Sequence, residues 1–296
     1  MSENEMVDQC TYEIREAKTV EQIDYGAKCF WKMSDEVYNE SSALRHSLLT
    51  KIFPPKTPLD FLIAGQYKSE KRTQSLEMGT ATHLAVFQPN EFESRVALSP
   101  SIDRRTKAGK EEHAAFEAES VGKIIIDKGD LDTCFYIRDA MYRHPLGRML
   151  ETKKGIPELS GFFKWRDTTC KFRADYLVPD KRIIFDLKTT TAGHDFAFRS
   201  SVTDYNYHTQ ALYYMQGASQ ITCRDFVTWI WIVVEKTMPF KIYLYQPEKR
   251  WLEVAESRID TAIKLIEKCG EEGEWPGPSV NVETLFVPGW MNNDNN

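Results

Sequence analysis

Closely spaced cysteines are missing from this sequence. Structural zinc sites and iron–sulfur clusters need cysteine ligands at short spacings such as C-x-x-C, and no such pair occurs. We therefore expect no iron–sulfur cluster and reduced, mostly structural thiols. The six cysteines are dispersed over the chain, at Cys10, Cys29, Cys134, Cys170, Cys223 and Cys269.

Long hydrophobic runs and a net positive charge are missing as well. The longest apolar run, residues 226–234, is far shorter than a membrane-spanning helix and is typical of a buried strand. The N-terminus lacks the basic and then apolar pattern of a signal peptide, so we expect a cytoplasmic protein with no membrane partner. The net charge of −6 excludes a protein that coats nucleic acid through bulk charge, but it is compatible with a local basic channel.

No repeat or low-complexity linker divides the 296 residues. The pattern predicts one α/β domain in which a helical N-terminal part packs on a sheet. We set residues 1–40 apart as an N-terminal extension of unknown role, before a domain at 41–296. Helices are predicted at 42–51, 57–67, 77–87, from about 107, at 129–151, about 204–217 and about 247–269. Strands are predicted at 158–165, 169–178, 182–189, 224–234 and 241–246.

The most informative stretch reads as a β-hairpin. Two segments rich in β-branched and aromatic residues flank residues 179–182 (PDKR), which are turn-forming. If this four-residue loop closes an antiparallel pair, Val178 faces Ile183. Counting outward from that pair then places Asp175 opposite Asp186.

Two carboxylates and a lysine share one face of this hairpin. Side chains alternate along a strand, so Asp186 and Lys188 point the same way and Asp175 joins them, while Arg173 lies across from Lys188. Facing carboxylates repel unless a cation lies between them, and a hard divalent cation is the natural candidate. A solvated face with a cross-strand salt bridge would explain the same residues, and the hairpin alone does not decide.

Four further polar residues are candidates for the same site. Symmetric closure of the preceding hairpin pairs Glu158 with Leu177, which puts Glu158 either at the edge of the site or on the surface. His83 lies on a predicted helix, where it is either a metal or phosphate contact or an ordinary core histidine. Gln210 and Tyr214 are four residues apart and therefore neighbours on one helix face.

Taken in chain order, these residues resemble the motifs of the PD-(D/E)xK nuclease superfamily, and most closely its RecE-type (exonuclease VIII) branch. The first acid follows an alanine here rather than a proline. The resemblance implies a restriction-endonuclease-like core, a mixed central sheet flanked by helices. It is carried by residues 78–86 (MGTATHLAV), 104–110 (RRTKAGK), 173–175 (RAD), 186–190 (DLKTT), 210–214 (QALYY) and the ending 274–290.

The resemblance also implies roles for the residues. Lys188 would help to deprotonate the attacking water and stabilise developing charge, and Gln210 and Tyr214 would orient Lys188 or the phosphate. Mg²⁺, with Mn²⁺ as a substitute, would be held by His83, Asp175, Asp186 and the carbonyl of Leu187. Contacts to DNA phosphates would come from Arg104, Arg105, Lys107, Lys110 and Arg173, although a solvated loop explains the run at 104–110 equally well.

The implied function is a Mg²⁺-dependent exodeoxyribonuclease that degrades linear double-stranded DNA 5′→3′ from its ends. The 3′ single strands that remain would serve recombination through a RecT-like annealing protein. The family further implies a homo-oligomer such as a tetramer, and the compact size fits a phage protein acting in the bacterial cytoplasm. One alternative is a Cas4-like or RecB-like nuclease of other polarity; another is a nuclease-fold protein that binds DNA without cutting.

Overall fold

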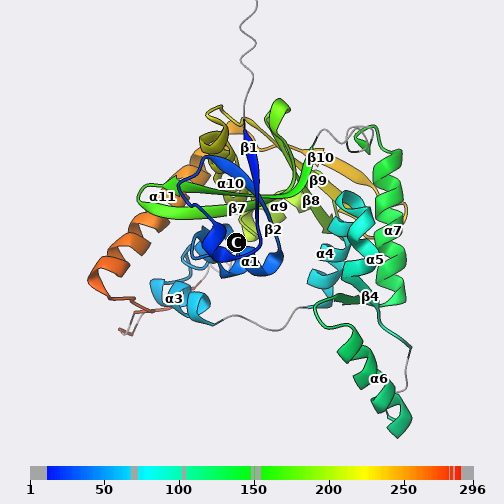
Figure 1. Ribbon diagram of the computed structural model, residues 1–296. Helices are drawn as coiled ribbons and strands as arrows, with labels where there is room; N and C mark the ends of the chain where they lie inside the picture. Colours follow the sequence, from blue (N-terminus) through cyan, green and yellow to red (C-terminus); the bar gives the residue numbers. More distant parts are fainter. Residues whose placement is uncertain are drawn as a thin grey trace, which may run out of the picture.

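A mixed eight-stranded sheet lies at the centre of the described residues, which are 12–67, 73–101, 105–147, 150, 155–279, 281–282 and 284–287 of the computed structural model (Figure 1). The pairs β1–β2, β3–β7 and β8–β9 are parallel, and the other pairs are antiparallel. Along the sheet the order is β1 (Glu13–Ala17), β2 (Cys29–Met33), β6 (Ile156–Trp165), β7 (Thr168–Val178), β8 (Ile183–Thr190), β9 (Thr228–Glu235) and β10 (Ile242–Tyr245), with β3 (Leu44–Arg45) paired to β7.

Helices cover both faces of this sheet. On one face α4 (Gln74–Phe87) and α7 (Lys128–Arg143) share a core with Phe185, and on the other α10 (Tyr207–Thr222) and α11 (Lys249–Glu272) share a core with Ile184. Because both faces are buried, the central strands are apolar at consecutive positions. This confirms the predicted α/β fold with a mixed central sheet flanked by helices.

Smaller elements complete the fold. The short strands β4 (Val96–Leu98) and β5 (Ile124–Ile126) form a separate parallel pair beside α4. None of the helices in the described parts of the chain has the length and apolar character needed to cross a membrane. The remaining helices are α1 (Asp35–Glu40), α2 (His46–Leu49), α3 (Pro58–Gln66), α5 (Phe92–Arg95), α6 (Lys107–Glu119) and α9 (Asp195–Asp204), with 3₁₀ turns at Val20–Gln22, Pro89–Glu91 and Pro179–Lys181.

Two glycines let α10 approach the sheet closely. A Cβ atom at Gly217 on α10 would lie 2.6 Å from the ring of Phe172, and one at Gly161 on β6 would lie 2.5 Å from the same ring. Such contacts are shorter than carbon atoms tolerate, so a larger residue at either position would push α10 away from β7. The position of Gln210 and Tyr214 over β7 therefore depends on these glycines.

The structure corrects part of the predicted element order. The helix predicted at 42–51 is wrong at its start, because Leu44 and Arg45 pair with Cys170 and Lys171 as strand β3, and only His46–Leu49 is helical. Strands β1, β2, β4 and β5 and helix α9 were not predicted. The boundary at residue 40 stays a prediction, although β1 and β2 extend the same sheet.

Candidate functional site

The β7–β8 hairpin places the two predicted acids near each other. Val178 pairs with Ile183, as predicted, and the ladder runs back to Tyr176 opposite Phe185. There it stops, because the Asp175 carboxylate, rather than a backbone carbonyl, accepts the hydrogen bond of the Leu187 N–H at 2.8 Å.

Neither the predicted pair of Asp175 with Asp186 nor that of Arg173 with Lys188 is therefore part of the ladder. Beyond the end of the ladder β8 pairs with β9, and Lys188 lies opposite Val233. Arg173 pairs with Ser160 on β6. The two cations are thus separated by the strand divergence that opens the site.

Glu158 lies at the site, although its predicted register was wrong. The turn after β6 consists of residues 166–167, so Leu177 pairs with Ile156 instead of with Glu158. The difference is two residues, which preserves the face of the sheet, and it brings Glu158 level with Asp175. Glu158 also has a positive φ of 50°, a conformation that is uncommon for a residue with a side chain.

Three side chains from three different elements converge here. Ligand atoms of His83, Glu158 and Asp175 all lie within 4.8 Å of one another. The His83 ring on α4 has its Nε2 3.0 Å from the carbonyl oxygen of Leu187 and its Nδ1 3.4 Å from Oδ2 of Asp175. Because a carbonyl only accepts, Nε2 carries a proton and donates it.

The charges in this cluster are strongly coupled. Burial lowers the pKa of His83, but the charge and hydrogen bond of Asp175 outweigh it and raise this pKa to about 9. Burial, followed by the repulsion of Asp175, raises the pKa of Glu158 to about 7. Burial also acts to raise the pKa of Asp175, but His83 and Lys188 lower it overall. Without a metal, an imidazolium therefore balances the Asp175 carboxylate.

Asp186 and Lys188 form a second, buried pair beside this cluster. The Lys188 Nζ lies 2.9 Å and 2.7 Å from the two oxygens of Asp186 and donates to Oε1 of Gln210 at 3.2 Å. Burial raises the pKa of Asp186 to about 6 even against the attraction of Lys188. Burial lowers the pKa of Lys188, but Asp186 and Asp175 raise it overall, so the ammonium keeps its charge.

These residues fit a divalent metal ion. The buried Oδ2 of Asp186 lies 2.7 Å from Lys188 Nζ as an ion pair but receives no hydrogen bond of good geometry, so it retains capacity to bind a cation. Opposite ligands of Mg²⁺ lie about 4 Å apart, a separation that the His83–Glu158–Asp175 cluster approaches. Carboxylate oxygens with an imidazole are suitable donors, and Asp175, Asp186, Glu158 and His83 are the residues that would hold the ion.

The site is open to solvent through a groove of about 780 Å³. Its lining includes Leu76 and His83 of α4 together with Tyr205 and Tyr207. Asp175 and Lys188 are also among the lining residues. A chain-like substrate can therefore reach the cluster directly.

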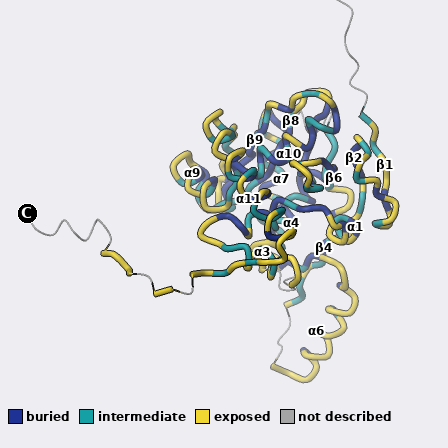
Figure 2. The backbone as a smooth tube through the Cα atoms, turned by 90° about the vertical axis from the view of Figure 1, so that its left-hand side faces the viewer, coloured by how far each residue is buried: buried dark blue, intermediate teal, exposed yellow. Residues whose placement is uncertain are grey.

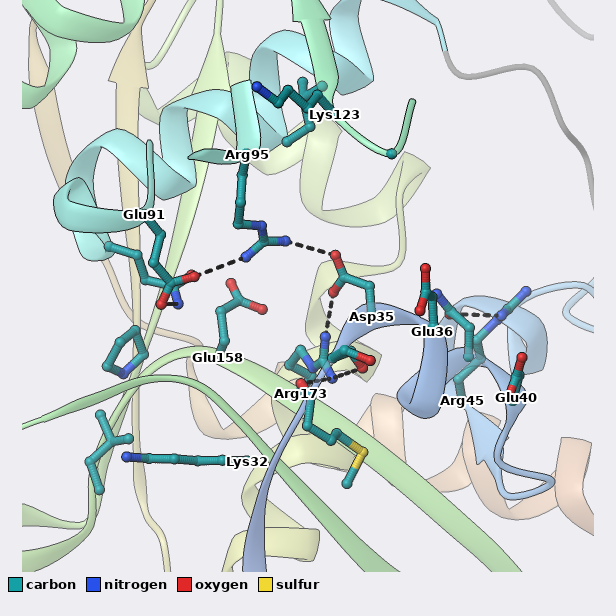
Figure 3. A pocket seen from close by; sticks show the side chains of 18 residues that line it. Lys32, Asp35, Glu36, Glu40, Arg45, Glu91, Arg95, Lys123, Glu158 and Arg173 are labelled. Atoms are coloured by element: carbon teal, nitrogen blue, oxygen red, sulfur yellow. Dashed lines mark hydrogen bonds and ion pairs between the residues drawn. The ribbon is translucent and has the colours of Figure 1, made fainter. Parts of the chain in front are cut away.

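A larger depression of about 1160 Å³ adjoins this groove and shares Glu158, Asp35 and Arg95 with it (Figure 3). Asp35 lies between Arg95 and Arg173 and forms ion pairs with both. Arg173 further donates to Ser160 Oγ and to the carbonyls of Met33 and Ser34. Arg173 thus holds the start of α1 against β7, and its role as a DNA contact stays a prediction.

The remaining predicted residues lie in two places. Tyr214 lines an adjoining pocket of about 400 Å³ together with Gln210 and Glu158; burial raises the pKa of its hydroxyl, against a hydrogen bond with Gln210 that lowers it. Lys107 and Lys110 lie on α6, which projects away from the sheet (Figures 1 and 2), and Arg105 precedes the N-cap residue Thr106 of that helix. Arg104 lies outside the described residues.

Sequence reasoning missed several residues at the site. Asp35 had no signal of its own, because it reads as an ordinary acidic residue in the first turn of a helix. Tyr205 and Tyr207 did have one, since two aromatic residues flank Asn206 directly before the helix that carries Gln210. Tyr207 contacts the site itself, with its ring centroid 4.5 Å from Lys188 Nζ.

A mixed sheet whose central hairpin carries Asp175, Asp186 and Lys188 defines the PD-(D/E)xK class of fold and site. Residues 60–286 match the model of a family described as "PDDEXK-like domain of unknown function (DUF3799)", and the chain belongs to this family. The superfamily predicted from the motif order is thereby confirmed. No curated protein is detectably similar to the chain.

One solved structure has the same fold. The crystal structure named "Putative exonuclease", from Eubacterium rectale, is similar with a TM-score of 0.59 and 13% sequence identity, over 89% of this chain and 99% of that chain. At this identity the likeness concerns the fold alone. The crystal structure of SSO0001 aligns with a TM-score of 0.26 and 14% identity over 64% of this chain and 87% of that chain, which is too weak to support an argument.

Proposed function

We propose that the protein is a divalent-metal-dependent nuclease that hydrolyses phosphodiester bonds of DNA. The observation that carries this proposal is the Asp186–Lys188 pair beside the His83–Glu158–Asp175 cluster, in an open groove. A solvated surface salt bridge would leave both partners exposed, whereas the Asp186 side chain is 2% exposed. Burying two acids and a lysine next to a groove is costly for stability and typical of a catalytic site.

Each residue has a role that its contacts support. Mg²⁺, when bound, neutralises phosphate charge and acidifies water. His83, Glu158 and Asp175, whose ligand atoms cluster, would hold it together with the neighbouring Asp186. Lys188 is held by Asp186 and Gln210 so that its ammonium can release a proton and stabilise charge on the phosphate. Gln210 accepts a hydrogen bond from Lys188 and so orients the ammonium. Tyr214 in turn forms a hydrogen bond with Gln210.

Within this class we favour an exodeoxyribonuclease that degrades linear double-stranded DNA 5′→3′ and leaves 3′ single strands for recombination. Support comes from the ordered resemblance to the RecE-type branch. A RecT-like annealing protein, a tetrameric assembly and Mg²⁺ as the natural ion belong to the same proposal.

The first test of this function uses linear duplex labelled at its 5′ or 3′ end. We expect early release of the 5′ label with Mg²⁺, no release with EDTA, and no attack on closed circular DNA until it is linearised. The physical reason is that an exonuclease needs a free end. Steady nicking of intact circles or fixed internal cleavage positions would instead identify an endonuclease, and early release of the 3′ label would identify the opposite polarity.

A second test concerns the basic run at 104–110. If these four cations contact DNA phosphates, replacing Arg104, Arg105, Lys107 and Lys110 with alanine makes the plot of log K against log salt less steep. The negative slope shrinks in magnitude by about 0.9 for each lost contact. Binding should weaken alike on all sequences, because phosphates carry no sequence information. Fluorescence anisotropy over a salt series measures both.

A matched variant has the same change in net charge on a different exposed helix, α11. It replaces Lys249, Arg250, Lys264 and Lys268 with alanine. If both variants lost the same DNA affinity, residues 104–110 would contribute only through net charge. If the variant at 104–110 kept the wild-type slope, these residues would not contact DNA.

A further inference from the structure

An exposed aromatic pair stands at the rim of the candidate site. Tyr205 is 65% exposed, and its ring stacks on that of Tyr207 with centroids 5.5 Å apart and an interplanar angle of 25°. The Tyr207 ring centroid in turn lies 4.5 Å from Lys188 Nζ. The two rings thus connect the catalytic ammonium with solvent.

Local structure fixes this arrangement. Tyr205 is the C-cap residue that follows α9 and Tyr207 begins α10, and Asn206 between them adopts a left-handed conformation with φ 58° and ψ 37°. Asparagine tolerates this conformation better than most residues. The Tyr207 ring also stacks on Phe198, with centroids 6.1 Å apart. Tyr205 is therefore presented on a supported turn.

The exposure of Tyr205 does not by itself indicate a binding role, because single exposed aromatic residues are common. The position of Tyr205 is different: it lines both the groove that contains Asp175 and Lys188 and the adjoining pocket that contains Gln210. Phe196, on the same helix α9, is 80% exposed and is not among the residues that line either depression. The chain therefore offers a natural comparison.

We propose that Tyr205 stacks on an unpaired nucleobase of the scissile strand. Base–aromatic stacking is the usual way in which proteins hold single strands without reading sequence. Each nucleotide adds about 3.4 Å along a strand, so the steps of 4.5 and 5.5 Å place the Tyr205 ring within about three nucleotides of the phosphate at Lys188. A base inside a duplex has both faces occupied by its neighbours, so the base on Tyr205 has left the duplex stack in this proposal. This inference rests on the proposed nuclease function.

The test measures DNA binding in an Asp186→Asn background, so that the DNA is not cut. Fluorescence anisotropy with Mg²⁺ compares duplexes that have a short single-stranded tail, 5′ or 3′, with the same duplexes whose tail is abasic. We expect Tyr205→Ala to weaken binding of the normal tail of at least one polarity by about 5- to 150-fold, the range for loss of one stacked base. It should leave binding of the abasic tail unchanged. Tyr205→Phe, which keeps the ring, should restore the lost affinity, and Phe196→Ala should bind like the parent.

Equal loss on normal and abasic tails, or no loss on either, would overturn the inference. The outcome separates it from the proposed function. If wild-type protein cuts DNA and Tyr205→Ala binds both tails like the parent, the nuclease function stands and the stacking role fails. If wild-type protein does not cut DNA but binding depends on Tyr205 and on the base, the stacking role stands and the nuclease function fails.

Discussion

Replacing Asp186 with asparagine is expected to abolish Mg²⁺-dependent DNA cleavage while the fold survives. Asparagine has the shape of aspartate and keeps an oxygen that can accept from Lys188, so packing around this 2% exposed side chain is preserved. What is lost is the negative charge that a divalent ion requires. Charge stabilisation by a catalytic metal contributes several kcal/mol, which corresponds to a loss of about 10³-fold or more in rate.

Cleavage of labelled linear duplex measures this loss, and calorimetric titration with Mg²⁺ should show weakened binding of the ion. The matched control is Asp180→Asn, the same change at an exposed position in the turn of the same hairpin. It should cut DNA like the wild type. Near wild-type cutting by Asp186→Asn, with thermal unfolding unchanged, would show that Asp186 is not part of a metal site.

The centre of the site was predictable because strong local rules apply there. A four-residue turn fixes Val178 opposite Ile183, and alternation along β8 puts Asp186 and Lys188 on one face. The end of the ladder was not predictable. The ladder ends because the Asp175 side chain accepts the hydrogen bond of the Leu187 N–H in place of a backbone carbonyl. The alternation of residue types along a strand does not reveal such competition between side chain and backbone.

The register of Glu158 failed for a different reason. Its hairpin closes through the two residues 166–167, and Arg166 adopts a positive φ of 54°. Positions of positive φ in such two-residue turns are usually held by glycine or asparagine, whereas Arg166 stands here, so the sequence does not reveal that the turn has only two residues. Tertiary packing selects it, and a shift of two residues follows in every pair of the hairpin.

A basic residue in the sequence was the least informative signal of a DNA contact. Arg173 was predicted to contact DNA phosphates as part of what the family resemblance implies. In the fold it donates to Asp35, Ser160 and two backbone carbonyls, so most of its hydrogen-bonding capacity is used within the protein. Sequence reveals that a charge exists, whereas only the structure reveals whether it is already paired.

Replacing Lys188 is expected to impair catalysis while leaving DNA binding nearly unchanged, because the contacts of its ammonium lie within the protein. Lys188→Met keeps most of the side-chain length and removes the charge. Its Nζ is directed at Asp186 and Gln210, and the side chain is only 18% exposed, so it offers little as a phosphate anchor. Loss of the charge leaves Asp186 buried without its cation, which lowers the free energy of unfolding by up to about 3–5 kcal/mol.

We therefore expect Lys188→Met to reduce the rate of cleavage by about 10²- to 10⁴-fold, the range for loss of proton transfer or charge stabilisation, with DNA affinity nearly unchanged. Single-turnover cleavage and anisotropy measure the two quantities separately, at a temperature where unfolding by urea shows the variant to be folded. Lys181→Met, at an exposed position in the turn of the same hairpin, is the matched control and should behave like the wild type. If affinity and cleavage instead fell in proportion, Lys188 would be a simple phosphate anchor, and proton transfer would have to come from another group.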